Sequence, residues 1–158
     1  MSVATDDIAS NLYLTVKVGI QPFGIPVLCV HDVSKSQKIA KVPLAPPEVA
    51  GALNLRGRIV TVIDVARKLN LPDENKVAPE DSMYVVIEFE NELYSLMVDS
   101  VGDVMTPGAQ SVEQNPANME QGWRDVSAGV CRLDGELLVL VDVDRFFGDT
   151  KTKTTPST

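Results

Sequence analysis

The sequence predicts a mainly β protein in which two similar small β units pack against each other. Three observations predict this fold class. The 158-residue chain holds ten glycines and ten prolines, which favour many turns and short strands over long helices. Apolar, β-branched runs are separated by turn sequences along most of its length. A stretch in the middle of the chain is repeated near the C-terminus.

The strands are expected where apolar runs lie between turn signals. In chain order these runs are residues 12–18, 25–30, 51–55, 59–65, 83–89, 93–98, 130–133 and 137–143. A turn is expected at Gln21–Gly24, and residues 42–47 are expected to be extended because they are rich in proline. Hairpins are expected at the three turns 56–58, 90–92 and 134–136, the last of which contains Asp-Gly, a strong hairpin signal.

Three short helical turns are expected. Residues 46–50 begin with two prolines, which suit a first helical turn. Residues 64–69 offer Asp64 as an N-cap, with Pro72 soon after as a stop. Residues 142–147 repeat that pattern, with Gly148 as the expected C-cap.

The repeat sets residues 51–67 over residues 129–145 without a gap, and a weaker match sets 23–33 over 94–104. A unit of this size buries too little surface to be very stable alone, so the two units are expected to pack face to face. The expected domain is residues 10–148, divided roughly into barrel 1 over 10–75 and barrel 2 over 80–148, with strand crossover left open. The polar segment 73–81 is the expected boundary, and residues 1–9 and 149–158 are expected to be flexible ends.

Composition narrows the class of partner. The net charge of −8 at pH 7 makes nucleic acid and anionic lipid poor partners. The first residues show neither a basic region nor an apolar run, and no stretch approaches 18 consecutive apolar residues. A cytoplasmic protein is therefore expected. Cys29 and Cys131 lie in apolar runs, so buried free thiols are expected, with a disulfide left open.

No set of residues suggests catalysis or a cofactor, so the expectation is a non-enzyme without cofactor or metal. His31 is the only histidine, and nothing around it resembles a nucleophile elbow. One histidine and two distant cysteines do not supply a zinc site. Glycine patterns for phosphate binding are absent. Asp64 and Asp142 are interpreted as helix N-caps in preference to catalytic carboxylates.

The run 23–30 shows little alternation, so both faces of that strand are expected to be apolar. One face would fill a barrel. The other would form an interface, either between the two units or with a partner, and the sequence leaves these two readings open.

One segment carries a family resemblance. Residues 46–69 contain a proline lead-in, a glycine, Asn54-Leu55-Arg56-Gly57, a spacer and Val62-Ile63-Asp64-Val65 before a helical turn. This order closely resembles the central signature of CheW-type chemotaxis adaptors. The first hairpin of that family resembles residues 23–27 followed by 30–33, and the resemblance continues through 98–104 and 133–137 to about residue 148.

The resemblance implies two intertwined five-stranded SH3-like barrels. It implies a non-enzymatic adaptor that couples the cytoplasmic tips of chemoreceptors to the regulatory domain of a CheA-type histidine kinase. It also implies a receptor-side surface formed by Val30, Asp32, Gly51, Arg56 and Gly57. We hypothesise an ion pair between Asp32 and Arg56. The family often has glutamate in place of Asp32 and proline in place of Thr61, and the shorter aspartate arm puts that pair in doubt.

Three other functions compete with the adaptor. One is a free-standing copy of the kinase regulatory domain, and this chain contains no ATP-binding glycines or acidic receiver pocket. A second is a small ligand-binding β-barrel, against which the aromatic content of 5% argues. An enzyme is the third, and it lacks an assembled catalytic group.

Overall fold

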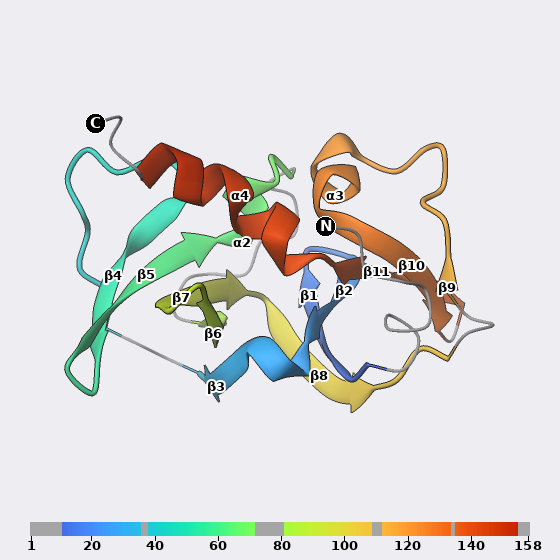
Figure 1. Ribbon diagram of the computed structural model, residues 1–158, viewed down its shortest axis with the longest axis horizontal. Coiled ribbons are helices and arrows are strands. Elements are labelled where there is room, and N and C mark those ends of the chain that lie inside the picture. The colour runs from blue at the N-terminus through green and yellow to red at the C-terminus, as the bar shows by residue number, and fades with distance from the viewer. Residues whose placement is uncertain (1–10, 36–37, 72–80, 109–111, 134, 155–158) are drawn as a thin grey trace.

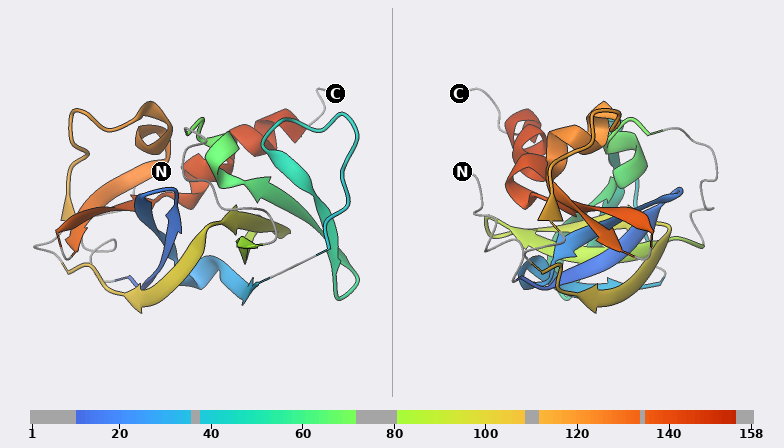
Figure 2. Two further views of the ribbon diagram at one scale, coloured as in Figure 1. Left: turned by 180° about the vertical axis from the view of Figure 1, so that it is seen from behind. Right: turned by 90° about the vertical axis from the view of Figure 1, so that its right-hand side faces the viewer.

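The computed structural model describes residues 11–35, 38–71, 81–108, 112–133 and 135–154. Two curled antiparallel-rich sheets lie side by side along the long axis of the molecule, and the helices α2, α3 and α4 lie together on one side of them (Figure 1). The same arrangement is visible from behind and from the end in Figure 2. The predicted mainly β fold class is therefore confirmed.

A six-stranded sheet has the order β8-β1-β2-β11-β10-β9. Its strands are β1 (Tyr13–Val18), β2 (Gln21–Pro26), β8 (Ser100–Met105), β9 (Val112–Glu113), β10 (Ser127–Leu133) and β11 (Glu136–Val141). A five-stranded sheet has the order β3-β6-β7-β5-β4. Its strands are β3 (Val30–Ser34), β4 (Val49–Leu55), β5 (Arg58–Asp64), β6 (Met83–Phe89) and β7 (Glu92–Val98). We call the two curled sheets the six-stranded and the five-stranded barrel.

The sequence repeat is preserved in the strand pairing. Gly51 lies opposite Val62 in β4–β5, and the residues 78 positions later, Gly129 and Leu140, lie opposite each other in β10–β11. In each hairpin the register shifts between this glycine and the residue two positions before it. The weaker match also holds, because Val33 pairs with Val85 while Val104, 71 positions after Val33, pairs with Leu14. The repeat is therefore a structural one.

The two halves exchange strands. The β4–β5 hairpin of the first half joins β7 of the second half through a parallel pairing of β5 with β7. Likewise, β11 of the second half pairs in parallel with β2 of the first. A division into 10–75 and 80–148 therefore does not separate the two sheets, and the crossover that the sequence left open is present. The predicted boundary lies mostly outside the described residues.

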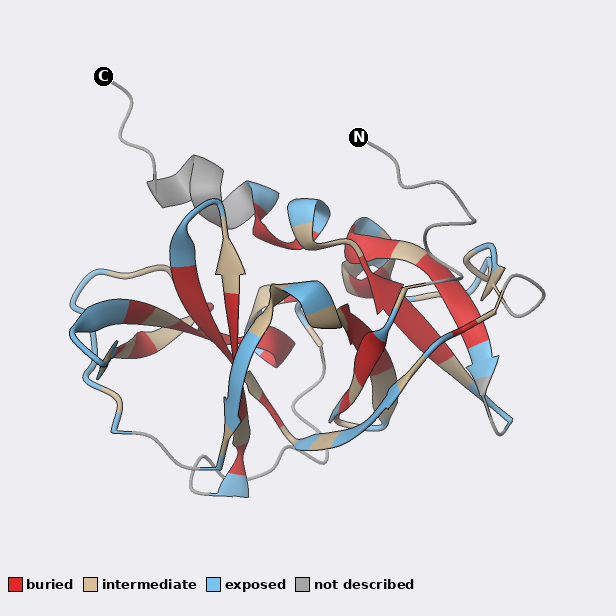
Figure 3. Cartoon of the chain, turned by 60° about the horizontal axis from the view of Figure 1, so that its bottom comes forward, coloured by how far each residue is buried: buried red, intermediate tan, exposed pale blue. Residues whose placement is uncertain are grey.

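A shared apolar cluster holds the two sheets and the helices together. It contains Phe23 and Val139 of the six-stranded barrel, Ile63 and Leu96 of the five-stranded barrel, and Phe147 of α4. Because side chains alternate along a strand, each sheet also has a cluster of its own on its other face. These clusters contain Val60, Val62, Tyr84 and Val86 in the five-stranded barrel and Tyr13, Leu138 and Leu140 in the six-stranded barrel. Buried residues accordingly follow the strands of both sheets (Figure 3).

Several local predictions were wrong. The expected turn at Gln21–Gly24 is part of strand β2, and the chain turns at Gly19-Ile20 instead. The expected strand 25–30 breaks after Pro26 into the 3-10 helix η1 (Val27–Cys29), so Leu28 is 94% exposed. This break explains the missing alternation, because residues 27–29 turn in a 3-10 helix and do not extend the strand.

The helix predictions had mixed outcomes. The helix α2 (Val65–Lys68) begins after Asp64 as predicted, and α3 (Gln121–Val126) was not predicted. Residues 46–50 form no helix, since they turn and enter β4. Gly148 does not end α4 (Val143–Thr154), which continues to Thr154. Residues 1–10 and 155–158, like Pro72, lie outside the described residues.

Candidate functional site

The five residues of the predicted partner surface all belong to the five-stranded barrel. Val30 and Asp32 lie on β3, Gly51 lies on β4, and Arg56 and Gly57 form the turn between β4 and β5. Since β3 and β4 stand at opposite ends of the strand order, strand pairing does not place the five residues side by side. They mark two edges of the same barrel.

The Arg56-Gly57 turn presents an exposed cation. The φ angles of Arg56 and Gly57 are 53° and 88°, the pattern of a two-residue hairpin turn whose twist matches the strands. Asn54 stabilises the turn because its Oδ1 accepts a hydrogen bond of 2.9 Å from the Gly57 N–H. Both turn residues are exposed, so the Arg56 guanidinium is available to a partner.

Gly51 has a different role from the other four residues because it is buried. A Cβ at this position would overlap the Ile39 side chain and lie 2.5 Å from the Ala40 carbonyl oxygen. Ala40 and Ala52 form two mutual backbone hydrogen bonds of 2.8 Å, which hold the segment after β3 against β4. Gly51 therefore allows this close approach of the backbone.

Asp32 and Arg56 do not form the hypothesised ion pair. Asp32 is exposed, and its Oδ1 accepts a hydrogen bond of 2.9 Å from the neighbouring Val33 N–H. The ion pairs of the described part of the chain do not include one between Asp32 and Arg56. The pair was in doubt because of the short aspartate arm, and three strands separate β3 from β4 in the sheet order.

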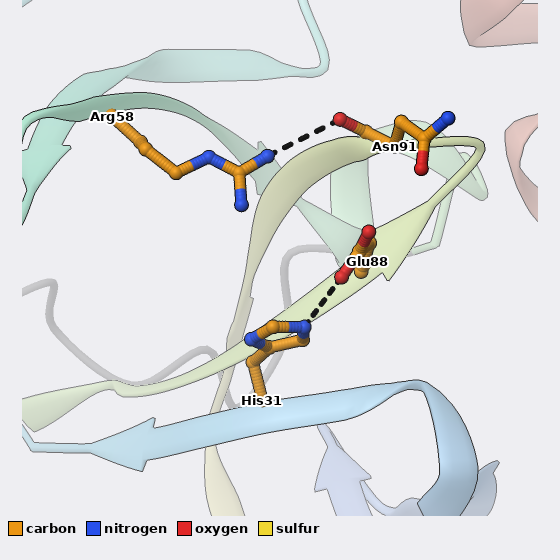
Figure 4. Close-up of polar contacts among 4 residues, drawn as sticks. All are labelled: His31, Arg58, Glu88 and Asn91. Carbon is orange, nitrogen blue, oxygen red and sulfur yellow. Dashed lines mark hydrogen bonds and ion pairs between the residues drawn. The ribbon is translucent and has the colours of Figure 1, made fainter.

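Sequence reasoning missed a group of polar contacts at one end of this barrel. His31 of β3 contacts Glu88 of β6, with 2.6 Å between His31 Nε2 and Glu88 Oε1 (Figure 4). Arg58 of β5 donates a hydrogen bond of 3.2 Å to the carbonyl oxygen of Asn91 in the β6–β7 turn. These contacts join strands of the two halves of the chain, so no local sequence pattern indicated them.

The two aspartates considered for catalysis are helix N-caps. Asp64 Oδ1 accepts a hydrogen bond of 3.3 Å from the Arg67 N–H at the start of α2. Asp142 Oδ1 accepts the equivalent bond, also 3.3 Å, from the Arg145 N–H at the start of α4. Each carboxylate thus satisfies a helix N–H group that has no partner within the helix.

The thiols are poorly suited to nucleophilic chemistry. Cys29 and Cys131 are free. Burial, with a contribution from Asp144, raises the pKa of Cys29. Burial, with a contribution from Glu113, raises the pKa of Cys131. Because the thiolate is the reactive form, both shifts lower the reactivity of these side chains at neutral pH.

Neither a metal site nor a membrane-spanning helix is present in the residues that the structure describes. They contain no group of three or more histidine, cysteine, aspartate or glutamate side chains that could hold a metal ion. None of the helices in these ranges is both long enough and apolar enough to span a bilayer.

Comparison with known proteins identifies similar chains. The family model of the CheW-like domain matches residues 12–151. The chemotaxis protein CheW of Rhizobium meliloti is 26% identical over 133 residues, which cover 83% of each chain. The chemotaxis protein CheW of Bacillus subtilis is 28% identical over 122 residues, or 77% of each chain.

The fold also has a solved counterpart. The crystal structure of the scaffolding protein TtCheW from Thermoanaerobacter tengcongensis superimposes with a TM-score of 0.75 at 24% sequence identity. The match covers 87% of this chain and 92% of that one. At this identity the similarity shows that the two chains share a fold.

Proposed function

This chain belongs to the CheW-like domain family and is a chemotaxis coupling adaptor, and we propose that it joins the cytoplasmic tips of chemoreceptors to a CheA-type histidine kinase. The observation that carries the proposal is the family match over residues 12–151, which covers both barrels. On this proposal the protein is non-enzymatic and works in the cytoplasm, where it stabilises an assembly in which receptor conformation sets the kinase rate. The competing functions, a free-standing kinase regulatory domain and a ligand-binding barrel, are not favoured.

We propose that the receptor binds the five-stranded barrel at its exposed edge and turn. Asp32 and Arg56 are exposed and have opposite charges, and Arg56 has no ion pair among the described residues. Their charges are therefore free to meet complementary groups on a partner, which favours specificity and rate of association. Val30 adds a half-buried apolar side chain next to Asp32.

Gly51 and Gly57 support this surface through the backbone. Gly57 completes the turn that presents Arg56. Gly51 leaves room for the chain after β3 to cross β4. A substitution at Gly51 would consequently weaken receptor binding by moving this segment, whereas a substitution at Arg56 would remove a direct contact.

A pull-down from lysate of the source organism tests the proposal with wild type, Arg56→Ala and a control, Arg132→Ala. Arg132 is an exposed arginine of the six-stranded barrel. We expect wild type and the control to recover the kinase and the receptors, and Arg56→Ala to recover the kinase with fewer receptors. Equal recovery of receptors by Arg56→Ala would contradict the site, and recovery of neither partner by wild type would contradict the function.

A further inference from the structure

A pocket of about 230 Å³ opens in the six-stranded barrel, and residues of β1, β2, β8 and β11 line it. Its apolar wall includes Pro22 and Leu138, and Leu138 belongs to the apolar cluster of that barrel. Its polar wall is formed by Thr15, Lys17, Ser100 and Glu136. The pocket therefore combines an apolar surface with two side chains of opposite charge.

The repeat identifies the equivalents of these two charged residues in the five-stranded barrel. Lys17 and Glu88 each lie one residue before the end of the first strand of their hairpins, β1–β2 and β6–β7. Glu136 and Arg58 each begin the second strand of their hairpins, β10–β11 and β4–β5. Each of the two positions thus carries opposite charges in the two barrels.

In the five-stranded barrel both charged residues have partners within the chain (Figure 4). Glu88 Oε1 lies 2.6 Å from His31 Nε2. Arg58 donates a hydrogen bond of 3.2 Å to the Asn91 carbonyl oxygen. The charged groups of this barrel are therefore already engaged in contacts of its own.

The six-stranded barrel offers neither partner at the equivalent places. In the weaker match of the repeat, Gly102 takes the place of His31, and it has no side chain to contact Lys17. The β1–β2 turn presents the carbonyl oxygen of Ile20, which is a hydrogen-bond acceptor like the Glu136 carboxylate, so the two cannot bond. Accordingly, neither Lys17 nor Glu136 has an ion-pair partner among the residues that the structure describes.

We propose that this pocket binds a small zwitterion, namely an α-amino acid with a short apolar side chain. Lys17 binds its carboxylate, Glu136 binds its ammonium group, and its side chain packs against Pro22 and Leu138. A ligand with a single charge leaves one of the two pocket charges without a partner. The zwitterion is therefore preferred over a simple acid or amine of the same shape.

The volume of the pocket limits the ligand. Pockets for drug-sized ligands measure about 300–1,000 Å³, so this one takes a smaller molecule. Liquid water occupies about 30 Å³ per molecule, so 230 Å³ corresponds to about eight non-hydrogen atoms, the size of valine. Lys17 and Glu136 are exposed and their charges are screened, so we expect an affinity in the millimolar range.

This site is separate from the proposed receptor surface, whose residues all belong to the five-stranded barrel. It adds a ligand site to an adaptor and does not replace the adaptor function. The inference is therefore independent of the proposed receptor and kinase partners.

Amide NMR spectra of the purified full-length protein, recorded during a titration with L-valine, test the inference. We expect the signals of Thr15, Gly102 and Leu138 to shift and to saturate in the millimolar range. Isobutylamine, which is valine without its carboxylate, and isovalerate, which is valine without its ammonium group, are the matched ligands. Each should bind about two- to fivefold more weakly, since each loses one exposed ion pair.

Variants assign each charge of the ligand to one side chain. Lys17→Met should no longer prefer L-valine over isobutylamine, whereas Lys17→Arg should keep this preference. Glu136→Gln should no longer prefer L-valine over isovalerate. Lys35→Met, at an exposed lysine just after β3, is the matched control and should bind all three ligands like wild type. The same spectra show whether each variant is folded.

Three results would overturn the inference. The first is L-valine that shifts none of the pocket signals of wild type in the millimolar range. The second is binding of isobutylamine or isovalerate that is as tight as that of L-valine. The third is a folded Lys17→Met or Glu136→Gln variant that keeps the preferences of wild type, or a loss in Lys35→Met as large as in Lys17→Met.

Discussion

Gly51→Ala should destabilise the protein far more than Gly129→Ala, although the two glycines are equivalent in the repeat. Both are buried, and their φ angles of 157° and 150° are nearly the same. The backbone strain caused by adding a side chain is therefore about equal at the two positions. Their surroundings differ. The added Cβ at Gly51 would lie 2.5 Å from the Ala40 carbonyl oxygen, whereas at Gly129 the nearest atom is the Glu113 carbonyl oxygen at 3.3 Å.

The magnitude follows from the two ways of relieving the overlap at Gly51. If the segment around Ala40 stays in place, overpacking costs about 1–3 kcal/mol. If it moves away, the two backbone hydrogen bonds between Ala40 and Ala52 are lost, at about 0.5–1.5 kcal/mol each. Either route predicts that Gly51→Ala lowers the free energy of unfolding by about 1–3 kcal/mol more than Gly129→Ala.

Urea unfolding followed by the fluorescence of the buried Trp123 measures both variants. Receptor binding by folded Gly51→Ala gives a second readout, because the variant should lose affinity even though Gly51 is buried. Equal destabilisation of the two variants, within about 0.5 kcal/mol, would refute the reasoning. It would show that the approach of Ala40 to β4 does not depend on the missing side chain.

Three other predictions concern single interactions. A double-mutant cycle with His31→Ala and Glu88→Ala should give a coupling energy below about 1 kcal/mol, because the pair is partly exposed, and a larger value would contradict this estimate. Asp64→Ala and Asp142→Ala should each lower the free energy of unfolding by about 1 kcal/mol through loss of a helix cap, and chemical denaturation would show no change if the caps were unimportant. Burial, together with the hydrogen bond to Glu92, raises the pKa of Tyr94 to about 12, above its unfolded value of 10.0. The free energy of unfolding should therefore fall as pH rises from about 10 to 12, and a smaller fall is expected in Tyr94→Phe.

Local signals predicted the hairpins and the repeat correctly. The turns at Arg56-Gly57 and Glu90-Asn91 are flanked by apolar runs that became paired strands. The repeated pattern around Gly51 and Gly129 reproduced the same pairing and the same register shift in both hairpins. These features depend on residues that are close together in the chain, so the sequence carries the information directly.

Local sequence patterns could not predict the exchange of strands between the halves. The pairing of β5 with β7 and of β11 with β2 is set by the shared apolar cluster, which residues far apart in the chain build together. The same exchange decides which polar side chains meet. It brings Arg58 to the Asn91 carbonyl group, and it leaves Asp32 without the hypothesised pairing to Arg56.

The ends of elements were also predicted poorly where two signals competed. Pro46 and Pro47 suit a first helical turn, yet the next residues enter β4 because their apolar side chains pack in the barrel. Gly148 suits a helix end, yet α4 continues past it. A glycine inside a helix costs only about 1 kcal/mol relative to alanine, so α4 can continue through Gly148.

We propose that this protein couples receptors to a kinase. Reconstitution of chemoreceptors and the CheA-type kinase of the source organism, with and without the protein, tests it most directly. We expect kinase autophosphorylation to respond to receptor stimulation only when the protein is present, and we expect Arg56→Ala to weaken the response while Arg132→Ala does not. A kinase that responds to the receptors equally well in the absence of the protein would contradict the account.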